Sequence, residues 1–180
     1  MLFIFNYLFV FSFLGFIIET AFSLIMKHHL EIRKTTRFLP FCTVYGFGAI
    51  AMYYALAPFY SYPIIVALLG IIIGTTIEYI YGHFALVLFK VRVWDYSHER
   101  RHYKRLIAPI FSIFWCILSL IFIYVVSPII SPLIALFPTY ISLTLLLLMI
   151  IDGIFTINMF IRIKNGENPE RFYCPAMKNA

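Results

Sequence analysis

Long apolar runs separated by short polar segments extend along the sequence to about residue 163. A membrane-spanning helix needs about 20 consecutive, predominantly apolar residues. Stretches of this kind cover residues 2–26, 40–59, 62–89, 106–127 and 138–163. The pattern therefore predicts an all-α, polytopic membrane protein. We expect a bundle of five transmembrane helices over residues 1–163, followed by a polar cytoplasmic tail over 164–180.

The prolines support these boundaries. Pro40 suits the first turn of a helix, where a missing N–H leaves no hydrogen bond unmade. Pro128, Pro132 and Pro138 predict a break between the fourth and fifth segments, because proline interrupts the helical hydrogen-bond ladder. No proline falls in the middle of a predicted span.

The composition fits the same class of protein. The chain is 63% hydrophobic and only 12% charged, whereas soluble domains average about 25% charged residues. A soluble globule of this size has too little interior for so many apolar side chains. Disorder is excluded as well, because it requires low hydrophobicity.

The charges predict an orientation. All 14 Lys and Arg residues fall within 27–37, 90–105 and 162–178. Basic loops of membrane proteins lie on the cytoplasmic side, so we expect the N-terminus outside and the C-terminus inside the cell (plasma or inner) membrane. The net charge of +6 then indicates contact with anionic lipid, and we expect no nucleic-acid partner.

The sequence shows no recognisable catalytic or cofactor motif. It contains no P-loop, HExxH, GxSxG or EF-hand pattern. Cys42, Cys116 and Cys174 form no CxxC pair, so we expect neither a disulfide framework nor a zinc site. We therefore expect no cofactor, no metal and no enzymatic activity, and we assign any ATP hydrolysis to a separate cytoplasmic subunit. His28 and His29 are expected at the solvated interface.

Three acidic residues lie inside apolar segments: Glu19, Glu78 and Asp152. An ionised acid at mid-bilayer costs about 2.5–3.5 kcal/mol on insertion scales, and no Lys or Arg lies at comparable depth. Two interpretations remain open. The acids are neutral carboxyl groups that hydrogen-bond across helices, or they line an inward-facing polar cavity and handle a proton or a cationic solute.

Small residues share helical faces with two of these acids. Gly15 and Glu19 lie one turn apart, and Gly70, Gly74 and Glu78 recur every four residues. Spacing of this kind allows close helix–helix contact, so we expect the three glycines at packing interfaces. Glu19 and Glu78 should then face each other or a shared polar cavity.

The segment after the third apolar stretch is basic and aromatic. We single out five of its residues: Trp94, Asp95, Tyr96, Arg100 and Arg101. Aromatic residues at the headgroup level and basic residues near anionic lipid are typical of an interfacial segment. Docking of a partner is one alternative, and catalysis by His98 or His102 with Asp95 is another.

Five segments together resemble a known family; they cover residues 12–20, 41–48, 74–79, 93–97 and 109–115. The resemblance is to the putative ABC-transporter type IV, or CmpB-like, membrane permease family, and extends over about residues 7–130. Glu19 and Glu78 fall within these segments, and Asp152 does not. The resemblance implies a membrane-embedded transport component.

We therefore expect a permease or transporter component with an inward-facing polar cavity. Its candidate lining residues are Glu19, Glu78, Asp152, Trp115 and Tyr45. Its partners would be the lipid bilayer and a separate ATPase or other membrane subunit. The alternatives are a non-catalytic scaffold or accessory subunit, and a membrane-embedded lipid-modifying enzyme.

Overall fold

The computed structural model describes residues 2–27, 34–168, 172 and 178–179. The predicted interfacial residues His28 and His29 lie outside this part of the chain, as does Cys174.

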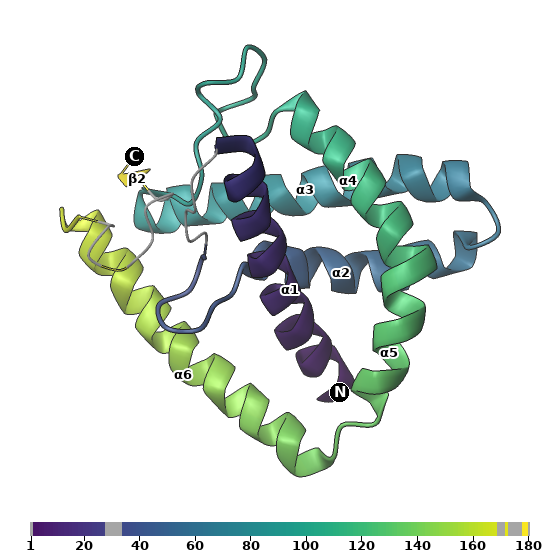
Figure 1. Ribbon diagram of the computed structural model, residues 1–180. Coiled ribbons are helices and arrows are strands. Elements are labelled where there is room, and N and C mark those ends of the chain that lie inside the picture. The colour runs from purple at the N-terminus through teal and green to yellow at the C-terminus, as the bar shows by residue number, and fades with distance from the viewer. Residues whose placement is uncertain (1, 28–33, 169–171, 173–177, 180) are drawn as a thin grey trace.

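The fold is all-α, as the apolar pattern predicts (Figure 1). The helices of the described chain are α1 (Leu2–Lys27), α2 (Thr43–Leu56), α3 (Pro63–Phe89), α4 (Pro109–Ile121), α5 (Ser127–Ala135) and α6 (Thr139–Lys164). A 3-10 turn, η1 (Ala57–Phe59), follows α2, and a π-helical turn, η2 (Phe122–Val126), joins α4 to α5. One short antiparallel pair, β1 (Val91–Arg92) with β2 (Lys178–Asn179), ties the tail to the end of α3.

Four helices of the described chain are long and apolar enough to cross a membrane. They are α1, α3, the continuous α4–η2–α5 helix and α6. Many of their large apolar side chains point outward; Ile64 of α3, for example, is 77% exposed. Lipid is the medium that suits such surfaces, and the helices fit a membrane protein.

The prediction of five spanning helices is wrong at α2. This helix has 14 residues, or about 21 Å at 1.5 Å per residue, against a hydrocarbon core of about 30 Å. Pro40 does not begin it, because the backbone before Thr43 is bonded elsewhere. The Cys42 N–H donates to the Ser12 carbonyl over 2.9 Å, and the Thr43 N–H donates to the Thr35 hydroxyl over 3.0 Å.

The predicted break after Ser127 is also absent. The helix passes through Pro128 and Pro132 and ends at Ala135. The π-helical turn η2 immediately precedes Pro128, and the Ser127 N–H donates to the Phe122 carbonyl five residues back. Membrane helices tolerate proline where local π adjustments satisfy the freed backbone groups, which accounts for the continuous helix.

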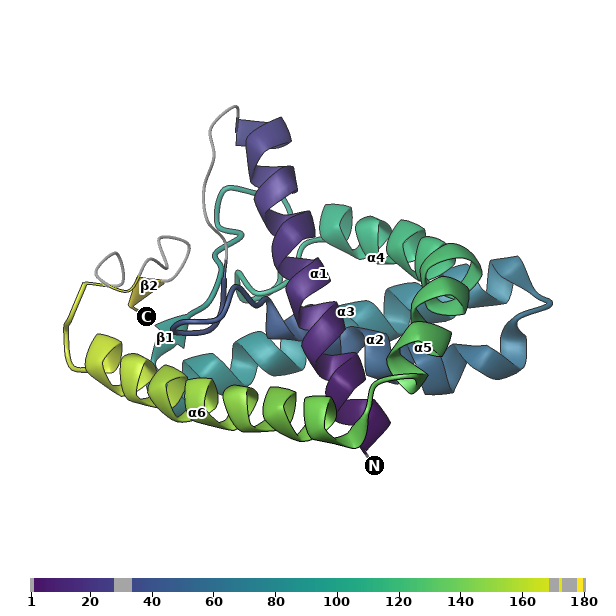
Figure 2. The ribbon, with the colours of Figure 1, turned by 60° about the horizontal axis from the view of Figure 1, so that its bottom comes forward.

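The helices do not form a simple parallel bundle. In Figures 1 and 2, α1 runs across α2 and α3, and α6 lies along the outside of the molecule. Both views place the C-terminal ends of α1, α3 and α6 on one side, together with the loop after α3. The basic residues that the structure describes therefore gather at this side of the protein. Which end faces the cytoplasm stays a prediction from the charges.

Two apolar clusters hold the helices together. The larger cluster joins α1, α2, α3 and the α4–α5 helix through buried side chains such as Tyr7, Met52 and Trp115. The smaller one lies at the basic end, where Phe160 and Ile163 of α6 pack with Val91. The candidate site lies beside Trp115, at the edge of the larger cluster.

Candidate functional site

Glu78 is a buried acid in α3 with two hydrogen-bond donors. Its side chain is 6% exposed. The Tyr96 hydroxyl donates to Oε1 over 2.6 Å, and the Trp115 indole N–H donates to Oε2 over 3.1 Å. Within the described ranges, no Lys, Arg or His forms an ion pair with this carboxyl group. Glu78 is thus held by neutral aromatic donors from the following loop and from α4.

Glu19 of α1 joins the same arrangement through Tyr45. The Tyr45 hydroxyl donates to Glu19 Oε1 over 2.7 Å. The ring of Tyr45 also packs against Trp115, with 5.4 Å between the ring centroids. The structure therefore connects both acids through two aromatic side chains. We call these residues the aromatic–acid cluster: Glu19, Tyr45, Glu78, Tyr96 and Trp115.

Glycines allow the helices of the cluster to approach. A Cβ on Gly74 would collide with the Trp115 ring, and one on Gly15 would collide with Tyr45. One turn before Gly74, a Cβ on Gly70 would collide with Ser119 of α4. Gly70 and Gly74 therefore permit α4 to lie directly against α3, which brings the indole within reach of Glu78.

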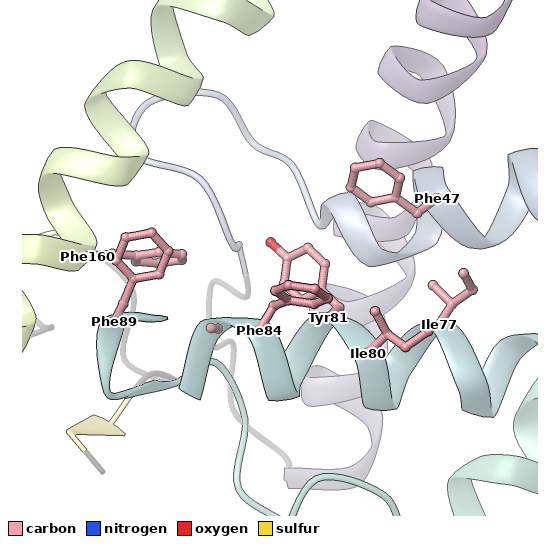
Figure 3. A pocket seen from close by; sticks show the side chains of 8 residues that line it. Phe47, Ile77, Ile80, Tyr81, Phe84, Phe89 and Phe160 are labelled. Atoms are coloured by element: carbon pink, nitrogen blue, oxygen red, sulfur yellow. The ribbon is translucent and has the colours of Figure 1, made fainter. Parts of the chain in front are cut away.

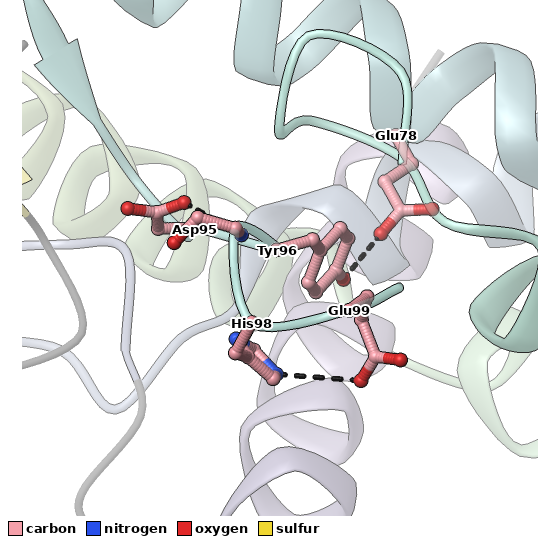
Figure 4. Close-up of polar contacts among 6 residues, drawn as sticks. Glu78, Asp95, Tyr96, His98 and Glu99 are labelled. Carbon is pink, nitrogen blue, oxygen red and sulfur yellow. Dashed lines mark hydrogen bonds and ion pairs between the residues drawn. The ribbon is translucent and has the colours of Figure 1, made fainter. Parts of the chain in front are cut away.

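The loop after α3 folds back onto the cluster. Tyr96 stacks on Phe111 of α4 with 4.3 Å between ring centroids, and this contact directs its hydroxyl toward Glu78 (Figure 4). Trp94 stacks on Tyr81 and donates its N–H to the Leu106 carbonyl over 2.8 Å. Both aromatic residues therefore pack against rings of the protein, and their position at the lipid headgroups stays a prediction.

The polar residues of this loop lie farther out. Asp95 accepts a hydrogen bond from the Ser97 N–H over 2.9 Å, while His98 lies 3.4 Å from Glu99 (Figure 4). Arg100 and Arg101 are exposed. This arrangement differs from a catalytic pair of His98 with Asp95. Their exposure leaves the two arginines accessible to a partner.

Lys104 anchors the outer part of the loop to α3. Its ammonium group lies 3.2 Å from the Tyr79 hydroxyl, one residue beyond Glu78. This hydrogen bond, together with the coulombic effects of Tyr103 and Tyr79, raises the pKa of the exposed Lys104 side chain. Lys104 is therefore charged at neutral pH.

Asp152 belongs to a different site. Its Oδ1 accepts a hydrogen bond from the Phe38 N–H over 2.7 Å. One turn later in α6, the Thr156 hydroxyl accepts one from the Arg37 N–H over 2.9 Å. Asp152 is 3% exposed, and its Oδ2 has no hydrogen-bond partner in the described part of the protein. The structure therefore places this acid where it fixes the segment before α2.

Two pockets lie elsewhere on the surface. One, of about 380 Å³, lies between α3 and α6 and is lined by apolar and aromatic side chains (Figure 3). The other, of about 420 Å³, adjoins Arg101, His102 and the start of α4. Neither is lined by Glu19, Glu78 or Asp152. The shared polar cavity therefore stays a prediction, and these two pockets are separate from it.

The chemical capacity of the cluster follows from its donors. An indole N–H can only donate, so Glu78 Oε2 remains an acceptor. A tyrosine hydroxyl both donates and accepts, so Oε1 keeps a partner whether the carboxyl group is ionised or protonated. The same holds for Glu19 and Tyr45. The sequence did not predict that Tyr96 belongs to the aromatic–acid cluster, because the ring that supports it, Phe111, lies in another helix.

Comparison with curated proteins and comparison with solved structures each found no match. A comparison with protein families found a match. Like the apolar helices, the matching family indicates a membrane protein. Residues 6–158 match the family described as Putative ABC-transporter type IV, and the chain therefore belongs to this family.

Proposed function

We propose that the protein is a permease-type transport component of the cell membrane, and that its aromatic–acid cluster takes up and releases a proton. The main support for this proposal is the environment of Glu78. This acid is buried in a membrane helix, and its two hydrogen-bond donors are the neutral side chains of Tyr96 and Trp115. Acids inside membrane helices commonly mark proton or ion pathways. The family to which the chain belongs supports a role in transport.

The geometry suits a change of protonation without a change of fold. When Glu78 is ionised, Tyr96 and Trp115 stabilise the two carboxylate oxygens. When it is protonated, the new O–H on Oε1 donates to the Tyr96 oxygen, while Trp115 still donates to Oε2. The hydroxyl of Tyr96 reverses its direction, and no buried carboxyl oxygen loses its partner.

Glu19 provides a second acidic group within the same cluster. Its partner Tyr45 packs on Trp115, which donates to Glu78. Movement of α1 or α2 would therefore alter the hydrogen bond between Trp115 and Glu78. A proton that leaves Glu78 toward the basic end would first meet the Tyr96 hydroxyl, which can both accept and donate. The loop after α3 therefore acts as the closure on that side of the cluster.

We assign nucleotide hydrolysis to a separate subunit, since the sequence contains no P-loop. The exposed Arg100 and Arg101 are suitable contacts for such a partner. Under this proposal the chain itself is not an enzyme.

A scaffold or accessory subunit is the second candidate, because the same hydrogen bonds join α1 to α2 and α3 to α4.

Infrared difference spectroscopy of the purified protein between high and low pH distinguishes the transport component from the scaffold. If Glu78 changes protonation, the band of the protonated carboxyl group appears at low pH in the wild type and is lost in Glu78→Gln. Glu167→Gln, which removes a half-buried acid paired with Arg162, is the control and should leave that band in place. An unaltered band in folded Glu78→Gln would favour the scaffold.

A further inference from the structure

A groove on the outer surface lies between α3 and α6, with Phe47 of α2 at one end (Figure 3). Its volume is about 380 Å³, and its lining includes Ile80, Phe84, Phe89 and Phe160. Phe47 and Phe84 are 46% and 59% exposed. The groove is therefore open to the surrounding lipid and has the apolar character of an acyl-chain site.

One end of the groove is basic. Phe89 and Phe160 meet there, with 5.3 Å between ring centroids. Lys90 follows Phe89 as the exposed residue that ends α3. The Lys164 ammonium group lies 3.4 Å from the Leu88 carbonyl oxygen, at the same end of α3.

These two lysines differ from their neighbour Arg162. Arg162 is paired with Glu167 over 2.7 Å, whereas neither Lys90 nor Lys164 forms an ion pair with a carboxylate among the residues whose positions are described. Two ammonium groups are thus available beside an apolar groove. That combination complements a phosphate group carried on a hydrocarbon chain.

We propose that this groove binds an anionic phospholipid, with an acyl chain between α3 and α6 and the phosphate at Lys90 and Lys164. The charge pattern predicts that this end faces the cytoplasm, where the leaflet is rich in anionic lipid. A zwitterionic lipid would fill the apolar part and would gain less from the lysines. The site uses no residue of the aromatic–acid cluster and does not depend on the proposed transport role.

The headgroup is tested by native mass spectrometry of the full chain with phosphatidylglycerol and phosphatidylcholine of identical acyl chains. We expect phosphatidylglycerol to be preferred roughly tenfold or more, given the attraction of each lysine to anionic lipid. The Lys90→Gln, Lys164→Gln double variant should lose that preference. The matched control, Arg100→Gln with Arg101→Gln, removes the same charge from the exposed loop and should retain it. Equal loss in both variants, or no preference in the wild type, would overturn the proposal.

The acyl part is tested separately. Ile80→Trp places a larger side chain in the groove, at a position already 43% exposed, and should reduce phosphatidylglycerol retention severalfold. Ile72→Trp, on the same helix, 60% exposed and outside the groove lining, is the control. Glycerol 3-phosphate, which lacks acyl chains, should not compete. Competition by this compound, or retention unaffected by Ile80→Trp, would contradict a lipid site.

Discussion

The Tyr96 hydroxyl lies 2.6 Å from Glu78 Oε1 and so joins a loop to the buried face of a membrane helix. The loop is separated from Glu78 by the last three turns of α3. The contact depends on Phe111, which stacks against the Tyr96 ring. A substitution at Tyr96 should therefore affect the packing and stability of the membrane helices.

Tyr96→Phe should lower the stability of the protein. The substitution removes one donor and leaves Glu78 Oε1 buried without its partner, which costs about 1–3 kcal/mol. Thermal unfolding of the purified protein in detergent measures the effect. Tyr62→Phe alters a tyrosine that is 59% exposed and should leave the midpoint near that of the wild type. Equal midpoints for the two variants would show that the Tyr96 contact adds no stability.

Gly74→Ala should disturb the contact between α3 and α4. The new Cβ would collide with the Trp115 ring, and overpacking of this kind costs about 1–3 kcal/mol. Gly153→Ala is the matched control, because nothing lies within 4 Å of the added Cβ. Alanine favours a helix over glycine, so the control should be neutral or slightly stabilising. The same unfolding assay compares them, and a stable Gly74→Ala would disprove the close approach.

Asp152→Leu should release the segment before α2. The Phe38 N–H would lose its acceptor in α6, whereas Asp152→Asn keeps a carbonyl oxygen for it. Hydrogen exchange should therefore accelerate at the amides of Phe38 and Arg37 in Asp152→Leu, and much less in Asp152→Asn. Thr144→Val, elsewhere on α6, alters a hydroxyl that bonds only within its own helix and serves as the control. Unchanged exchange in Asp152→Leu would rule out the anchoring role.

The orientation can be tested by cysteine labelling from outside intact cells. In a background without the native cysteines, Cys at Ser61 or Leu136 should react, because both residues are exposed in connections that contain no Lys or Arg. Cys at Ser97, in the basic loop, should react only after the membrane is made permeable. Labelling at Ser97 in intact cells would reverse the predicted topology.

Much of the fold follows from local sequence. The apolar runs predict helices close to α1, α3 and α6, because length and hydropathy decide a membrane helix. The short α2 was not predictable in this way. Its apolar sequence continues back to Pro40. Hydrogen bonds of the preceding backbone with α1, α6 and Thr35 keep that part out of the helix.

The candidate site was partly predictable. Glycine spacing indicated that Glu19 and Glu78 lie on packing faces, and the structure brings both acids into one cluster with Tyr45 and Trp115. The depth of Asp152 in its span could not separate it from the other two acids. Its partner is the backbone N–H of Phe38, in a segment distant along the chain. The composition of the loop predicted a position near lipid headgroups for Tyr96. Its contact with Phe111 could not be predicted from local sequence, because Phe111 lies in another helix.

The π-helical turn η2 has a consequence for how related sequences should be aligned. One extra residue in a helical turn rotates everything after it by about 100°, the advance per residue of an α-helix. Beyond η2, the hydroxyls of Ser127 and Ser131 both lie 3.3 Å from that of Tyr7 in α1. Deleting one residue from Phe122–Val126 would turn both serines away from α1. Relatives lacking this turn would match the chain only with a one-residue gap there. An ungapped alignment would compare positions of α5 that lie about 100° apart around the helix.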